Sequence, residues 1–135
     1  MKVAVIIARI LLGLPFVVFG LNGFLEFLPE AGEFSARAKA FLDGMGATGY
    51  MLPLLHITEV VCGALLVAGF FVPLALTVLA PVLVNVLLFH LKLETKGIEI
   101  AIVLCVLEAL LVFAHAPHFD GVLKMRAKPF TKPSP

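Results

Sequence analysis

Between Met51 and Leu91 the chain carries one formally charged side chain, that of Glu59. This apolar run is longer than the roughly 20 residues that cross a hydrocarbon core about 30 Å thick. The segment GFFVP at residues 69–73 supplies the glycine and proline that are typical of a turn. We therefore predict two membrane-spanning helices in this part of the chain, at about 51–71 and 73–91.

The composition of the whole chain also indicates a membrane protein. Hydrophobic residues make up 61% of the 135 residues and charged residues 14%, with a mean hydropathy of +1.12. Ordinary soluble domains carry about 25% charged residues. Two further apolar runs, at about 3–28 and 98–116, predict two more spans. We expect an all-α protein, an integral membrane four-helix bundle with up-down topology that occupies residues 1–118.

The loop at 29–50 is longer than a turn requires. Within it, Phe34, Phe41 and Met45 fall on one side of a helix, while Arg37 and Lys39 lie elsewhere. This pattern is typical of an amphipathic helix at a membrane surface. We predict a short interfacial helix between the first and second spans. The sequence leaves two interpretations of this segment open, a connector that follows the membrane surface or a lid over a pocket.

Basic residues set the expected orientation. Cytoplasmic segments of membrane proteins carry an excess of Lys and Arg. One side of the predicted bundle carries Lys2, Arg9, Lys124, Arg126, Lys128 and Lys132, and the other carries Arg37, Lys39, Lys92 and Lys96. We expect a multi-pass protein with both termini in the cytoplasm. Residues 119–135, which are basic and contain prolines, are expected to form a disordered cytoplasmic tail.

Four polar residues lie at similar depths in three of the predicted spans: Asn22, His56, Glu59 and Asn85. His56 and Glu59 are three residues apart and therefore share a helix face. Polar and ionisable residues inside a membrane are candidates for a functional site. One interpretation is a ligand-binding pocket formed by these four side chains, with Glu59 neutral. The other is a set of hydrogen bonds that only holds the helices together, and the sequence leaves both open.

Arg9 and Glu108 are the remaining charges inside the predicted spans. Each alone costs about 2.5–3.5 kcal/mol on insertion scales. If the first and fourth spans pack together, the arginine side chain can reach the level of the glutamate. We predict a structural ion pair between them.

Other kinds of site are not indicated. Cys62 and Cys105 stand singly in apolar segments without a C-x-x-C motif, so we expect them to be packing residues. No metal-ligand spacing such as H-E-x-x-H occurs, and we predict no metal site. A net charge of +1 gives no indication of nucleic-acid binding.

Three segments resemble a known family. These are RILLGLPFVVFGLNGFLEFLP, AFLDGMGATGYMLPLLHITEVVCGALLVAGFFVPLAL and LAPVLVNVLLFHL. Together they resemble the DoxX-like family of small four-helix membrane proteins. The resemblance implies a bacterial inner-membrane protein. Some relatives are subunits of a thiosulfate:quinone oxidoreductase, or are partners of redox and sulfur-handling enzymes.

Three functions follow as hypotheses. The first is an accessory subunit of a membrane redox system, with a redox enzyme as its protein partner and a quinone as ligand of the polar pocket. The second is a non-enzymatic scaffold or assembly factor in the lipid bilayer. The third is a transporter of small solutes or protons, which would require a homo-oligomer because four helices enclose little space. The family supplies no catalytic residues that can be assigned here, and we expect no independent enzymatic activity.

Overall fold

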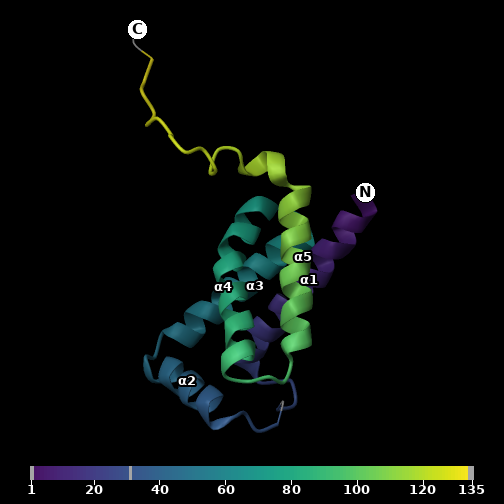
Figure 1. Cartoon of the computed structure of the whole chain (residues 1–135), viewed down its shortest axis with the longest axis vertical. Helices are drawn as coiled ribbons and strands as arrows, with labels where there is room; N and C mark the ends of the chain where they lie inside the picture. Colours follow the sequence, from purple (N-terminus) through teal and green to yellow (C-terminus); the bar gives the residue numbers. More distant parts are fainter. Residues whose placement is uncertain (1, 31, 134–135) are drawn as a thin grey trace.

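The computed structural model describes residues 2–30 and 32–133, and within these ranges the chain is all α-helical, without strands. Figure 1 shows the arrangement of the helices. The elements are α1 (Lys2–Leu25), α2 (Ala36–Ala47), α3 (Met51–Ala68), α4 (Val72–Lys92), α5 (Ile98–Ala114) and a 3-10 helix, η1 (Ala116–Phe119). Residues 120–133 form neither helix nor strand.

In the described part of the chain, three helices are long and apolar enough to cross a membrane: α1, α3 and α4. These three correspond to the first three predicted spans. The fourth predicted span forms α5, which has 17 residues and is therefore slightly shorter than the roughly 20 that a straight crossing requires.

The four long helices contact one another in a closed ring. α1 packs along α3 in the most extensive interface, α3 contacts α4, α4 contacts α5, and α5 returns to α1. Figure 1 shows α4 and α5 side by side, with α2 outside them at one end of the molecule. The core consists of large aliphatic side chains from all four helices, among them Leu12, Leu66, Leu79 and Leu111.

The turn predicted at 69–73 is present. Gly69 ends α3 with a φ of 82°, a left-handed conformation that glycine adopts without steric cost. Its N–H donates to the carbonyl of Leu65. Pro73 stands in the first turn of α4, where the missing N–H of proline leaves no hydrogen bond unmade. These residues fold the long apolar run into two helices.

The end of α1 differs from the predicted boundary at residue 28. The helix stops at Leu25, and Glu26 has a φ of 48°. The side-chain oxygen of Asn22 accepts a hydrogen bond from the backbone N–H of Leu28 at 2.7 Å. This asparagine therefore satisfies a backbone donor just after the helix end and fixes the chain as it turns toward α2.

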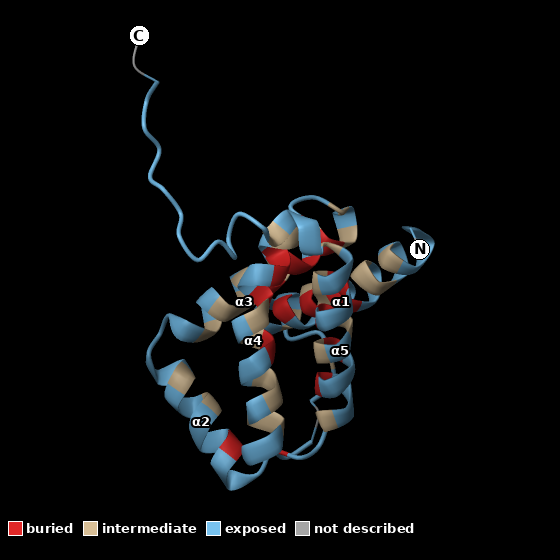
Figure 2. Ribbon diagram, turned by 45° about the horizontal axis from the view of Figure 1, so that its top comes forward, coloured by how far each residue is buried: buried red, intermediate tan, exposed pale blue. Residues whose placement is uncertain are grey.

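Close approach of α1 and α3 depends on two glycines. A Cβ on Gly13 would lie 2.7 Å from the carbonyl oxygen of Gly63, and a Cβ on Gly63 would lie 2.6 Å from that of Gly13. Small residues permit such contact between membrane helices. Figure 2 shows buried residues where the helices face one another and exposed residues over the outer surfaces. Large apolar side chains on those surfaces, such as Leu110 at 57% exposure, suit contact with lipid.

Candidate functional site

A cavity of about 520 Å³ lies between α2, α3 and α4. Its size falls within the usual range for small-molecule sites, about 300–1,000 Å³. Apolar and aromatic side chains dominate its walls. The lining residues are Phe41, Leu42, Met45, Tyr50, Met51, Leu54, Leu55, Thr58, Pro81, Val82, Asn85, Val86, Phe89 and His90. We call this cavity the α2 groove.

Helix α2 forms one wall of the groove, and aromatic contacts hold it against α4. The centres of the Phe41 and Phe89 rings are 5.8 Å apart. The centre of the Phe34 ring lies 6.4 Å from that of Phe89, and these two rings meet edge to face. Aromatic pairs at these separations are favourable beyond the area that they bury. The predicted interfacial segment is thus a helix, and its apolar side covers a cavity.

The start of α2 is fixed to the α4–α5 turn by Ser35 and Glu94. The carboxylate of Glu94 accepts hydrogen bonds from the backbone N–H of Ser35 at 2.7 Å and of Lys96 at 3.3 Å. The Ser35 hydroxyl donates to the carbonyl of Leu93 and accepts from the N–H of Ala38, capping α2. The hydrogen bond from the Ser35 backbone is the main reason that the pKa of Glu94 lies below its ordinary value.

Polar groups are few in the groove, and they differ in what they can still offer a ligand. The hydroxyl of Thr58 donates to the carbonyl of Leu54 at 2.8 Å. The Nδ1–H of His90 donates to the carbonyl of Glu94 at 3.0 Å, which leaves Nε2 as an acceptor in the neutral ring. Asn85 is exposed and lines the groove, and its amide can both donate and accept. The groove therefore suits an apolar molecule with one or two polar atoms.

His56 and Glu59 form a pair elsewhere, at the α1–α3 interface. His56 Nδ1 lies 3.1 Å from Glu59 Oε2, and the carboxylate is nearly buried. A Cβ on Gly20 would touch the Cβ of Glu59 at 3.1 Å, and a Cβ on Gly23 would overlap the His56 ring. The glycines of α1 therefore leave the space that this pair fills. The ring of Phe24 covers the histidine edge to face.

The structure does not gather the four predicted polar residues into one pocket. Asn85 lines the α2 groove, whereas His56 and Glu59 face α1, and Asn22 is engaged at the end of α1. The groove-lining residues of α3 and the His56–Glu59 pair lie about 120° apart around that helix, at about 100° per residue. The four residues were predicted to lie at similar depths. In the structure, however, the helices are rotated about their axes so that these side chains face different neighbouring helices.

The predicted ion pair between Arg9 and Glu108 is absent from the structure, and this prediction is corrected. Both carboxyl oxygens of Glu108 are buried without a hydrogen-bond partner among the described residues, as is Nε of Arg9. The guanidinium of Arg9 lies instead at the α3–α4 turn, where a Cβ on Gly69 would come within 2.8 Å of both terminal nitrogens. The arginine extends toward the end of the bundle, away from the level of the glutamate.

The sequence predicted the α2 groove only in part, through Asn85 and through the alternative of a lid over a pocket, although a further signal for it exists. Phe41, Leu42 and Met45 recur at helical spacing in the loop between the first two spans, and Pro81 and Asn85 recur at the same spacing in α4. The first pattern was interpreted as membrane contact or as a lid over a pocket. Which apolar face covers which helix depends on tertiary packing, so the sequence pattern did not identify a cavity.

Comparison with known proteins identifies one family. A family model described as DoxX matches residues 4–91, which extend from the start of α1 almost to the end of α4. No curated protein and no solved structure matches the chain. The matched range contains α2, α3 and all of α4 except its last residue, and so includes every residue that lines the α2 groove.

Proposed function

The chain belongs to the DoxX family of membrane proteins, and from this we propose that α1, α3, α4 and α5 cross a bacterial inner membrane as an up-down four-helix bundle. Three of these helices have the length and composition of spans, and the short turns at 69–71 and 93–97 suit antiparallel neighbours. The closed ring of contacts among the four helices supports the bundle.

The proposed orientation has both termini in the cytoplasm. The bundle end that carries the start of α1, the end of α5 and the tail holds six of the ten Lys and Arg residues. Asp120 is the one formal negative charge in that group of segments. The opposite end, with α2, carries more acidic than basic residues. An excess of Lys and Arg is typical of the cytoplasmic side.

We propose further that the protein is an accessory subunit of a membrane redox system and binds a quinone in the α2 groove. The observation that carries this is the groove itself, a cavity of about 520 Å³ with aromatic walls and Asn85. A quinone headgroup is a flat ring with carbonyl oxygens. The rings of Phe41 and Phe89 can contact its faces, and the Asn85 amide can donate to one carbonyl. Its isoprenoid tail would extend into lipid.

This role requires a partner. The groove supplies a binding surface. In an accessory role this chain would position the quinone, and a redox enzyme bound to the bundle would supply the electrons for its reduction.

The test measures thermal unfolding with and without a short-chain quinone. The wild type should be stabilised by the quinone, because a ligand that binds only the folded state raises its stability. Asn85→Leu and Phe41→Ala should lose that shift. Phe113→Ala is the matched control, since Phe113 is 79% exposed on α5 and lies outside the groove. Glu59→Gln should also keep the shift.

Two results would contradict the proposal. If the wild type shows no quinone-dependent shift, the groove is not a quinone site, and a scaffold function becomes the better account. If Glu59→Gln loses the shift while Asn85→Leu keeps it, the quinone binds at the α1–α3 interface.

A further inference from the structure

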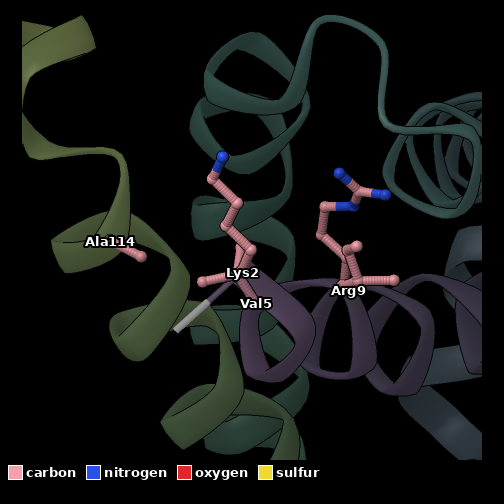
Figure 3. Close-up of a pocket in the computed structure, with 5 residues that line it drawn as sticks. Lys2, Val5, Arg9 and Ala114 are labelled. Carbon is pink, nitrogen blue, oxygen red and sulfur yellow. The ribbon is translucent and has the colours of Figure 1, made fainter.

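A second cavity lies at the other end of the bundle, between the start of α1 and the end of α5. It has a volume of about 400 Å³ and is lined by Lys2, Val5, Ile6, Arg9 and Ala114. Figure 3 shows the side chains of Lys2 and Arg9 extending to the same side of α1, with Ala114 on the neighbouring helix. We call this cavity the α1–α5 cleft. It is separate from the α2 groove and shares no lining residue with it.

Among the described residues, the two cations that line this cleft, Lys2 and Arg9, have no anionic partner. Lys2 and Arg9 are seven residues apart, which returns to nearly the same helix face after about two turns. The close contacts between acidic and basic side chains among the described residues are Lys39 with Asp43 and His56 with Glu59, and neither involves Lys2 or Arg9. Among the described residues, Nε of Arg9 is buried without a hydrogen-bond partner, and the terminal nitrogens of the guanidinium lie beside Gly69 at the α3–α4 turn. Because no carboxylate pairs with these terminal nitrogens in the described part of the chain, their N–H groups can donate to the phosphate or carboxylate of a ligand.

The walls of the cleft indicate what kind of anion it takes. Between the two cations lie Val5 and Ile6, and Ala114 completes an apolar side. At 1.5 Å of rise per residue, Arg9 lies about 10 Å from the start of α1. The phosphate of a lipid in the headgroup region can reach this depth. A ligand that bridges both cations therefore needs a negative group and an apolar part beside it. Anionic phospholipids combine the two.

We propose that the α1–α5 cleft binds one anionic phospholipid, with Lys2 and Arg9 on its phosphate and its acyl chains against Val5 and Ile6. The basic tail, with Lys124 and Arg126, emerges at the same end of the bundle and adds to the attraction for an anionic leaflet. The shared chemistry is recognition of a phosphate oxyanion. A free phosphate would satisfy the two cations but would leave the apolar wall without a partner.

Native mass spectrometry of the detergent-extracted protein tests the proposal. The protein is incubated with phosphatidylglycerol, with phosphatidylcholine or with inorganic phosphate. The wild type should retain one phosphatidylglycerol and should not retain phosphatidylcholine, which has no net charge. Arg9→Gln and Lys2→Gln should each weaken retention by about tenfold or more, the effect of losing a hydrogen bond to a charged group. Arg37→Gln is the matched control, because Arg37 lies in α2 outside the cleft, and this variant should retain the lipid.

Three results would overturn the proposal. Equal retention of the two lipids by the wild type would remove the selectivity for an anionic headgroup. If the wild type retains inorganic phosphate as strongly as it retains phosphatidylglycerol, the ligand is a free anion. Retention of phosphatidylglycerol by Lys2→Gln at the wild-type level would show that the two cations do not act together. That variant keeps the test decisive even if Arg9→Gln does not fold, because Lys2 is exposed.

Discussion

Substitution of Gly63 by alanine tests the packing that the rest of the bundle depends on. A Cβ at this position would lie 2.6 Å from the carbonyl oxygen of Gly13 and 2.9 Å from the backbone nitrogen of Val17. Both are backbone atoms, which cannot rotate away as a side chain can. The alanine therefore forces α1 and α3 apart along their most extensive interface.

The expected change in the free energy of unfolding follows from two opposing effects of the substitution. Alanine in a helix is more favourable than glycine by up to about 1 kcal/mol. Overpacking a well-packed interface costs about 1–3 kcal/mol, and rigid backbone neighbours place this site at the upper end. The net expectation for Gly63→Ala is a loss of about 2 kcal/mol in the free energy of unfolding. This corresponds to about 30-fold in the unfolding equilibrium.

Gly44→Ala is the matched control. Gly44 lies in α2, and a Cβ there would meet nothing within 4 Å, so the same substitution should leave stability unchanged or raise it by up to about 1 kcal/mol. The assay is equilibrium unfolding in micelles, followed by circular dichroism. If Gly63→Ala is as stable as the wild type, or responds as Gly44→Ala does, the close approach of α1 and α3 does not exist as described.

Three further predictions concern charged groups. The pKa of Glu94 lies below its ordinary value in the folded chain. Its contact with Ser35 therefore stabilises α2 fully at pH values above the ordinary glutamate pKa of about 4.3. This stabilisation is lost as the pH falls through the lower pKa of the folded chain. The protection factors of the α2 amides against hydrogen exchange should fall over that window in the wild type, and Glu94→Gln should show no such fall. Since Arg9 and Glu108 do not meet, a double-mutant cycle of Arg9→Gln and Glu108→Gln should give a coupling energy within about 0.5 kcal/mol of zero, and a clearly larger coupling would restore the ion pair. Reporter fusions after residue 135 and within 35–45 should report opposite sides of the membrane, and a periplasmic reporter at the C-terminus would contradict the proposed orientation.

The amino-acid sequence by itself determined the helices and placed their ends to within about three residues. Apolar runs, Gly69 and Pro73 placed α3 and α4 within a few residues of the predicted bounds, because hydrophobicity and turn chemistry act locally along the chain. The helix between the first two spans was predicted from its periodicity, and it is present as α2. The family was also evident from sequence, and the DoxX match agrees with it.

Only the tertiary structure decided which side chains meet. Asn85 and Glu59 were assigned similar depths, but one faces α2 and the other faces α1. Arg9 was expected to extend toward Glu108, and it lies at Gly69 instead. Depth follows from counting residues at 1.5 Å each, whereas the face that a helix presents depends on how it is rotated against its neighbours. That rotation is set by contacts between distant residues, above all the close approach of Gly13 and Gly63, and spacing within one helix does not encode it.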